Sequence, residues 1–182
     1  MKMKTSLKMM NKKSSLVLVL SLTLYSLAIQ AQEDEKKSFF GIGLNGGATV
    51  GDFEDTYSSN VGVDVIYLHK LSNRFYVGGS TGFANYFGDT LTSDGFGDVE
   101  LDDLQFIPVA ASLRVSPVRN LLGGVDIGYA FGLNNGNDGG FYASPRITYL
   151  VNKKWPIFAG YRLIGFEDEN LGALQFGIGF IF

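Results

Sequence analysis

The sequence lacks cysteine entirely and is poor in proline and charge. Without cysteine the chain has no disulfide, no thiolate metal site, no cysteine nucleophile and no lipid anchor on cysteine. Its 4 prolines exclude a proline-rich chain, and its charged residues, at 18%, fall below the roughly 25% of ordinary soluble domains. The 182 residues instead include 24 glycines and 14% aromatic residues. We therefore expect one domain, rich in glycine and aromatic side chains.

Residues 1–31 are predicted to be a cleaved export signal. The stretch MKMKTSLKMMNKKSS is basic, and the apolar stretch SLVLVLSLTLYSLAI after it is shorter than the roughly 20 residues of a membrane-spanning helix. Cleavage is expected after Ala31, and translation starts at Met1 or Met10. Five of the 15 basic residues lie in this signal, which leaves 10 against 18 acidic residues. A mature chain with a charge near −8 is not expected to bind nucleic acid.

After a short charged lead-in at residues 32–38, apolar residues recur at every second position, which is the period of a β-strand. Eight strands are predicted, at residues 39–50, 61–69, 74–87, 104–115, 121–133, 141–151, 155–166 and 171–182. Soluble sheets have strands of about 5–6 residues, whereas strands that span a membrane need about 9–11. The predicted lengths therefore favour a membrane barrel over residues 39–182.

The two faces of these strands differ in composition. One set is apolar and uncharged, as in Ile42 and Leu44, and the other is mostly Gly, Ser, Thr and Asn. A soluble lipocalin-like barrel would place the apolar set inside, and a membrane barrel would place it outside. A solvated face normally carries many Lys and Glu residues, and this polar face carries few. The prediction is an all-β, closed, antiparallel, up-and-down, eight-stranded transmembrane β-barrel.

The connections between the strands alternate in length and in charge. Short turns near residues 70–73, 116–120 and 152–154 carry Lys and Arg, whereas the segments 51–60, 88–103, 134–140 and 167–170 are mostly longer and carry only acidic charges. An up-and-down barrel places alternate connections at opposite ends. One end is therefore expected to be acidic and to carry long loops, and the other to be basic and tight, as in outer-membrane barrels.

Five charged residues fall in mid-strand on the inward set. They are Asp64, Arg114, Asp126, Arg146 and Arg162. Unpaired charges in a narrow lumen are costly, so we expect these residues to form a network of ion pairs and hydrogen bonds that plugs the barrel. The alternative is a gated or selective narrow pore.

The chain resembles the small eight-stranded outer-membrane barrels, the family of the OmpA transmembrane domain and of OmpX, over residues 38–182. The most specific resemblance is the pattern of Leu174, Phe176, Ile178, Phe180 and Phe182. The resemblance implies a Gram-negative outer membrane, contact with its lipid, and recognition of these residues by the barrel assembly machinery. The barrel is expected to be monomeric or weakly associated. The resemblance predicts the fold better than it predicts the function.

The acidic segment 89–103 is a candidate cation-binding loop. Its ligands would be Asp94, Asp98, Glu100, Asp102 and Asp103, because Ca²⁺ prefers oxygen ligands. The segment lacks the residue order of an EF-hand, so a solvated, mobile loop without metal is the simpler interpretation.

The expected function is non-enzymatic. The only histidine, His69, lies beside a tight turn, whereas the lipid-modifying barrel enzymes of this membrane need a His near a Ser at the opposite rim. We expect no catalytic residue, no metal and no cofactor. The prediction is a structural or surface-interaction role through acidic extracellular loops, with an unidentified extracellular partner. The alternative is a small porin-like pore or passive transporter for small or hydrophobic solutes.

Overall fold

The computed structural model describes residues 37–93, 97–167 and 169–182, with the backbone alone for 91–93 and 97–100. The predicted export signal lies outside the described residues. The described part contains ten strands: β1 (Ser38–Gly51), β2 (Tyr57–Lys70), β3 (Phe75–Gly88), β4 (Thr90–Ser93), β5 (Gly97–Glu100), β6 (Leu104–Val118), β7 (Leu121–Gly132), β8 (Gly140–Leu150), β9 (Pro156–Gly165) and β10 (Asn170–Ile181). None of the described segments is a helix that could cross a membrane.

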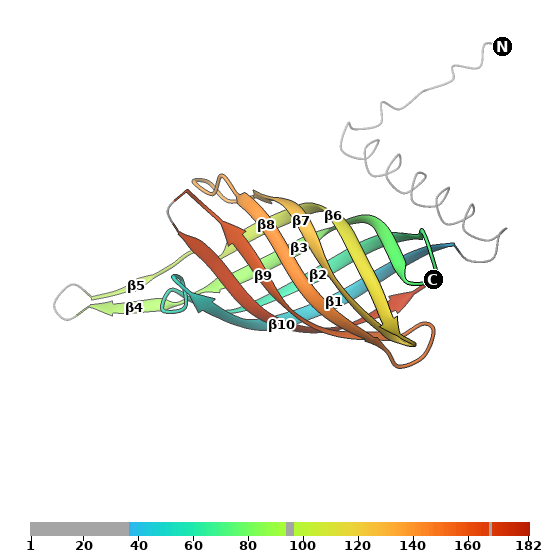
Figure 1. Ribbon diagram of the computed structural model, residues 1–182. Helices are drawn as coiled ribbons and strands as arrows, with labels where there is room; N and C mark the ends of the chain where they lie inside the picture. The colour runs from blue at the N-terminus through green and yellow to red at the C-terminus, as the bar shows by residue number, and fades with distance from the viewer. Residues whose placement is uncertain (1–36, 94–96, 168) are drawn as a thin grey trace, which may run out of the picture. The chain divides into compact units, whose positions relative to one another are not determined.

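Eight of the strands close into a single barrel in the order β1-β10-β9-β8-β7-β6-β3-β2 (Figure 1). Each barrel strand pairs antiparallel with its neighbours along the chain, and β1 closes the sheet against β10, with Leu44 opposite Ile178. The all-β, antiparallel, up-and-down, eight-stranded barrel is therefore confirmed. The predicted strands differ from the observed ones mainly at their ends, since β2 begins at Tyr57 rather than at Val61.

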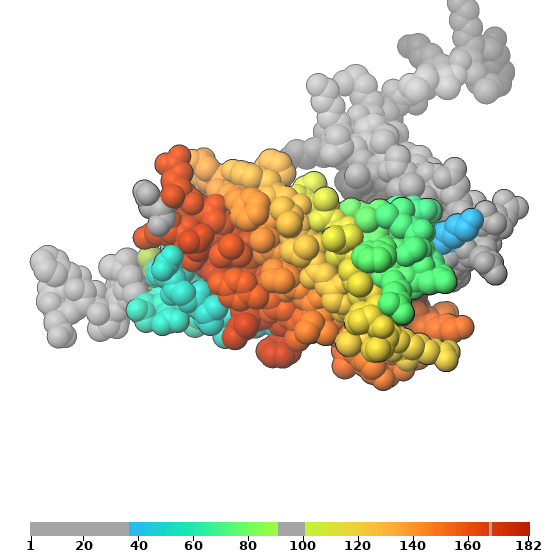
Figure 2. Space-filling model, in the orientation of Figure 1, coloured from blue at the N-terminus to red at the C-terminus, as the bar shows by residue number. Residues whose placement is uncertain are grey.

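The side chains alternate between the two faces of the sheet in the predicted sense. From Phe106 to Arg114 in β6, buried and exposed residues alternate strictly, with Leu113 exposed and Arg114 buried. On the outer face, Leu44 is 62% exposed and Phe176 is 69% exposed, whereas inward-facing Asp126 is 0% exposed. Figure 2 shows one side of the barrel, where the side chains of β7 to β10 form a continuous outer surface. An apolar outer face around a polar interior is the arrangement of a membrane barrel.

The tight turns owe their shape to short polar residues. Asn120, in the turn between β6 and β7, has a φ of 68°, a left-handed conformation that asparagine tolerates better than most residues. In the turn between β8 and β9, the Oδ1 atom of Asn152 accepts hydrogen bonds from the backbone N–H groups of Lys154 and Trp155, at 2.8 and 3.1 Å. These turns fix the register of the strands that they join.

The opposite end of the barrel carries the longer connections. The segment 89–103 contains the antiparallel ribbon of β4 and β5, with Leu91 opposite Val99 (Figure 1). The sequence pattern indicated no strand here, so the interpretation of this segment as a plain loop is wrong. Thr90, Leu91, Thr92 and Val99 are residues that favour strands, which explains the ribbon.

The barrel interior is apolar at the loop end. An aromatic and aliphatic cluster fills it, formed by Tyr57, Ala84, Tyr86, Phe106, Ala110, Ala130, Tyr142, Ile164, Leu171 and Ala173. The rings of Tyr86 and Phe106 meet edge to face, with centroids 5.9 Å apart. We call this cluster the apolar cap. It separates the polar middle of the lumen from the loop end.

Candidate functional site

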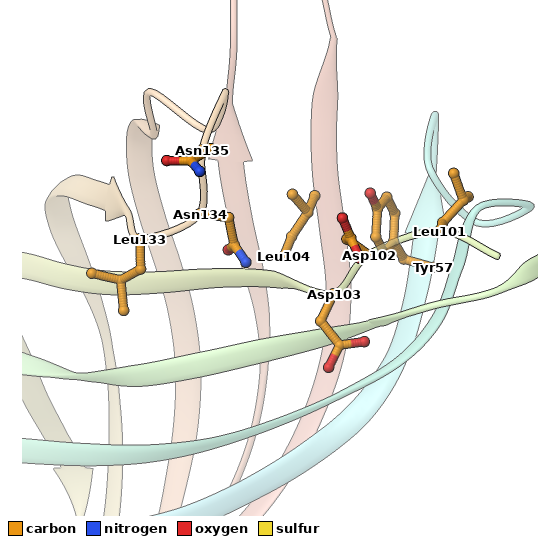
Figure 3. Close-up of a pocket in the computed structure, with 8 residues that line it drawn as sticks. All are labelled: Tyr57, Leu101, Asp102, Asp103, Leu104, Leu133, Asn134 and Asn135. Carbon is orange, nitrogen blue, oxygen red and sulfur yellow. The ribbon is translucent and has the colours of Figure 1, made fainter.

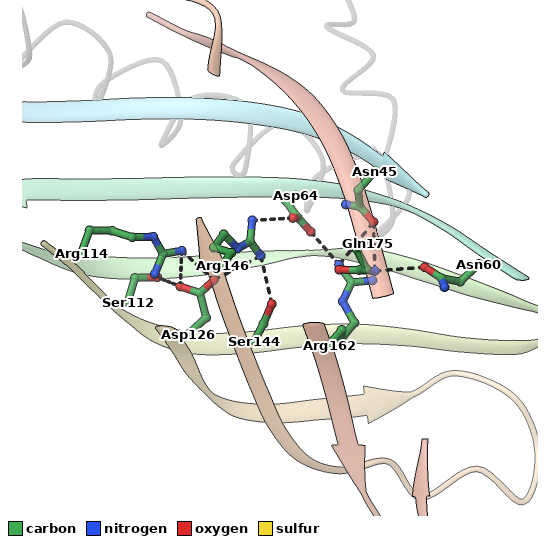
Figure 4. A network of polar contacts seen from close by, with 10 residues as sticks. All are labelled: Asn45, Asn60, Asp64, Ser112, Arg114, Asp126, Ser144, Arg146, Arg162 and Gln175. Carbon is green, nitrogen blue, oxygen red and sulfur yellow. Dashed lines mark hydrogen bonds and ion pairs between the residues drawn. The ribbon is translucent and has the colours of Figure 1, made fainter. Parts of the chain in front are cut away.

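The structure brings the five predicted lumen charges together in one line across the barrel (Figure 4). Arg114 contacts Asp126 at 2.7 Å, and Arg146 contacts the other oxygen of Asp126 at 3.2 Å. Arg146 also contacts Asp64 at 2.9 Å, and Arg162 contacts Asp64 at 3.1 Å. We call this alternating line, Arg114–Asp126–Arg146–Asp64–Arg162, the charge chain. It draws on β6, β7, β8, β2 and β9.

Glycines on neighbouring strands make room for the arginines. Gly124 lies opposite Arg114 on one side and Arg146 on the other, and Gly160 lies opposite Arg146. A Cβ atom at Gly124 would meet the carbonyl oxygen of Leu113 and the side chain of Arg114. One at Gly160 would meet the carbonyl oxygen of Pro145 and the side chain of Arg146. The lumen of an eight-stranded barrel is just wide enough for side chains, so these two glycines leave room for the side chains of Arg114 and Arg146.

Neutral polar side chains complete the network. Ser112 donates a hydrogen bond to Asp126, and the Nη2 atom of Arg146 donates to Ser144 at 3.4 Å. The Nε2 atom of Gln175 donates to Asn60 at 3.0 Å and to Asn45 at 3.3 Å. These residues were not predicted from the sequence to belong to the network. Most of them fall on the inward-facing alternate positions of the predicted strands, which could have indicated the role. Asn60 does not, because it precedes the predicted start of its strand.

The charge chain is enclosed by protein. Arg162 and Asp126 have 0% of their side chains exposed, and Arg114 has 2%. At such positions the loss of hydration is offset only where each charge has close partners of opposite sign. Each carboxylate here has two arginine partners, which makes the chain a cooperative unit rather than a set of separate pairs.

A pocket of about 940 Å³ opens at the loop end of the barrel (Figure 3). We call it the rim pocket; Tyr57, Asp102, Asp103, Leu104, Leu133 and Asn134 are among the residues that line it. The carboxylate of Asp103 accepts hydrogen bonds from Asn85 Nδ2 at 2.8 Å and from the backbone N–H of Gly88 at 3.1 Å. Asp103 therefore links the end of the β4–β5 segment to β3 through these hydrogen bonds.

The candidate cation loop receives no support from the part of the chain that the structure describes. Asp94 lies outside the described residues, as do the side chains of Asp98 and Glu100. Among the described residues, Asp102 and Asp103 included, no group of three or more potential ligands gathers to hold a metal. Metal binding at this segment remains a prediction of the sequence.

The predicted assembly residues lie on the outer side of β10 and just beyond it. Leu174, Phe176, Ile178 and Phe182 are each about half exposed or more. The ring of Phe180 packs edge-on against Trp155 and Phe182, with centroids 5.1 and 5.2 Å apart. This places one continuous apolar and aromatic stripe along the strand that closes the barrel.

His69 has one serine partner. Its Nδ1 atom lies 3.1 Å from the hydroxyl of Ser38, which also lies 3.1 Å from the hydroxyl of Tyr67. All of these groups are at the tight-turn end, and no described carboxylate hydrogen-bonds to His69. Within the described part of the chain, the pair has no third group of the kind that orients a catalytic histidine.

Charge is segregated along the barrel axis. Outside the charge chain, the basic residues from position 37 onward all lie at the tight-turn end: Lys37, Lys70, Arg74, Arg119, Lys153 and Lys154. Among the described residues, the acidic residues outside the charge chain belong to the loop-end segments, as with Asp52, Asp89 and Asp138. The described charges are therefore separated along the barrel axis, and a role for the acidic segments outside the cell remains a prediction.

Comparisons with known proteins agree with this geometry. No protein-family model and no curated protein matches the chain. The Yersinia pestis outer membrane protein Ail in a phospholipid bilayer nanodisc has a TM-score of 0.55 and 18% identity, over 80% of this chain and 98% of Ail. The crystal structure of Ail, the attachment invasion locus protein, gives 0.53 and 17%, over 80% and 97%. A de novo designed transmembrane β-barrel gives 0.50 and 13%, over 83% of this chain and all of the design.

The closed eight-stranded sheet, its apolar outer face and these similarities define the class of protein. The fold is that of the small eight-stranded outer-membrane β-barrels of Gram-negative bacteria. At these levels of identity the similarity establishes the fold, and function has to be argued from the site.

Proposed function

We propose that this protein is a monomeric, non-enzymatic surface-interaction barrel that binds a basic extracellular partner through its acidic loop end. The observation that carries the proposal is the axial separation of charge. Outside the charge chain, the loop-end segments carry only Asp and Glu, and the tight-turn end carries the Lys and Arg residues. A surface of one sign steers a partner of the opposite sign and raises the rate of association.

The rim pocket is the proposed contact point within that acidic end. It combines carboxylates at Asp102 and Asp103 with amide groups at Asn134 and with apolar walls at Leu104 and Leu133. A lysine or arginine side chain fits such a lining, because its stem is apolar and its head is cationic. The Ail structures support a surface role by analogy alone, through the printed description of Ail as an attachment invasion locus protein.

The lumen is proposed to be plugged. The charge chain crosses the barrel at mid-height, and the apolar cap fills the lumen above it. Ions passing through would have to displace arginines that are already paired with carboxylates. The protein is therefore expected to add no conductance to a planar lipid bilayer, whereas a small pore would give discrete single-channel steps.

Binding is tested with the barrel in lipid nanodiscs and a lysine-rich peptide as the probe. We expect binding that weakens as salt rises, since exposed charges are screened. The double variant Asp102→Asn, Asp138→Asn should weaken it. The matched control, Lys153→Gln with Lys154→Gln at the opposite end, should leave it unchanged. Equal binding by all three proteins would contradict the proposal.

A further inference from the structure

The loop-side end of the charge chain leaves most of one guanidinium without a partner. Arg162 is completely buried, and its Nη2 atom donates to Asp64 at 3.1 Å and to Asn45 at 3.5 Å. Its Nε and Nη1 atoms have no hydrogen-bond partner among the described residues. At the other end of the chain, Arg114 donates from Nη2 to both oxygens of Asp126 and from Nη1 to the carbonyl of Leu113.

The charge chain holds a surplus of one positive charge. It contains three guanidiniums and two carboxylates, and each carboxylate is shared between two arginines. Because Arg114 has the shortest contact and Arg146 bridges both carboxylates, the surplus is greatest at Arg162. A buried charge without a full complement of partners calls for a counter-charge.

Other unpartnered groups surround the same end of the chain. They are Asn45 Nδ2, Thr49 Oγ1, Asn60 Nδ2 and Tyr86 Oη. In the sheet register, Asn60 lies opposite Tyr86, and Ala173 lies opposite both Thr49 and Arg162. The Cβ position of Gly62, two residues beyond Asn60, is 3.4 Å from Arg162 Nη1. Every one of these atoms can donate a hydrogen bond.

Bulk water has no direct access to these donors from the loop side. The apolar cap covers them, and Tyr86, Phe106, Ile164 and Leu171 within it are all 0% exposed. The acceptor that these donors need must therefore lie inside the barrel. Among the described side chains, no third carboxylate forms an ion pair with the charge chain.

We propose that a small inorganic anion of the halide class binds inside the barrel beside Arg162. It would accept hydrogen bonds from Nε and Nη1 of Arg162, Oη of Tyr86 and Nδ2 of Asn60. One negative charge balances the surplus of the charge chain. The narrow lumen of an eight-stranded barrel favours a monatomic anion over phosphate or sulfate.

The direct test is diffraction from crystals of the refolded barrel grown in sodium bromide. We expect an anomalous bromide peak within hydrogen-bond distance of the Arg162 guanidinium. A parallel measurement compares urea unfolding in sodium chloride and in sodium gluconate at equal ionic strength. The unfolding midpoint should be higher in chloride, because an anion that binds only the folded state stabilises it.

Two variants separate specific binding from general salt effects. Tyr86→Phe removes one donor and is expected to weaken halide affinity about tenfold, the loss of one hydrogen bond to a charged group. Tyr129→Phe removes an outward hydroxyl that donates to the carbonyl of Asp138 and should leave the halide effect unchanged. Arg162→Gln should abolish the difference in unfolding midpoint between chloride and gluconate. If this variant fails to fold, the bromide peak and the Tyr86→Phe variant still test the proposal. An ordered water in place of bromide, with equal midpoints in chloride and gluconate, would overturn the proposal.

Discussion

At the residue scale, the two lumen carboxylates, Asp64 and Asp126, each form ion pairs with two buried arginines. Asp126 serves both Arg114 and Arg146, and Asp64 serves both Arg146 and Arg162. Loss of either carboxylate would leave two buried guanidiniums short of a counter-charge. The stability of the barrel should therefore depend more on these residues than on any surface charge.

Asp126→Asn tests this dependence. We expect the variant to lose about 3–5 kcal/mol of unfolding free energy, the usual penalty for breaking a buried ion pair from one side. The measurement is urea unfolding in lipid vesicles, followed by the fluorescence of Trp155, the only tryptophan. Exposed Asp138→Asn is the control, expected within about 0.5 kcal/mol of the parent. Similar unfolding midpoints for both variants would show that the charge chain is not structural.

A second residue-scale prediction concerns Gly177, which faces the lumen near the tight-turn end. A Cβ atom there would meet the ring of Phe158 and the carbonyl oxygen of Leu44. Gly177→Ala should therefore lower stability by about 1–3 kcal/mol through overpacking. At Gly123 nothing lies within 4 Å of an added Cβ, so Gly123→Ala is the matched control. Adding Phe158→Leu to Gly177→Ala should recover part of the loss, and no recovery would contradict a steric origin.

The residues of the charge chain could be predicted from the sequence. Successive side chains of a β-strand point to opposite faces of the sheet, so the position of an isolated charge in the strand shows which face it lies on. The partners of each charge could not, since contacts such as Arg162 with Asp64 join strands far apart in the chain. The role of Asn60 was missed for a different reason. The segment 51–60 was predicted to be a loop, whereas the strand that contains Asn60 begins at Tyr57.

At the scale of strands, alternation predicts the two faces well in the middle of the barrel and poorly at its loop end. There, neighbouring residues are both apolar, as with Phe141 and Tyr142 or Leu163 and Ile164. One residue of each pair faces outward, and the other enters the apolar cap. The cap was not predicted, because composition alone does not reveal where the lumen changes from polar to apolar.

The strand that closes the barrel supplies the prediction at this scale. We propose that the outward stripe ending in Phe182 is the signal recognised by the barrel assembly machinery. Phe182→Ala should reduce assembly into membranes that contain this machinery by several-fold, yet leave unassisted refolding in detergent nearly unchanged. Band intensity of the folded form on unheated gels measures both.

Phe176→Ala on the same strand is a control for general loss of outward apolar area, since Phe176 is also exposed to the outside. If both variants assemble equally slowly, the effect comes from apolar area along β10 and not from a terminal signal. If Phe182→Ala assembles as well as the parent, the proposed signal is wrong.

At the scale of the whole molecule, the closed sheet, the outward apolar face and the separation of charge agree with a protein fixed in one orientation across a membrane. Closure is required in lipid, because an open strand edge would leave backbone N–H and C=O groups unpaired. The sequence predicted the barrel and its two ends because each strand and turn carries its own local signal. It could not predict the partner, which depends on how separate loops come together at the rim.

The assignment of the apolar face to the outside of the barrel is tested most directly by one measurement. The mature chain is refolded in detergent and run on a gel with and without boiling. We predict that the unboiled protein migrates differently from the boiled one, as expected of a closed barrel that resists detergent. Identical migration, together with a soluble monomer in detergent-free buffer, would mean that the apolar set faces inward and that the protein is not a membrane barrel.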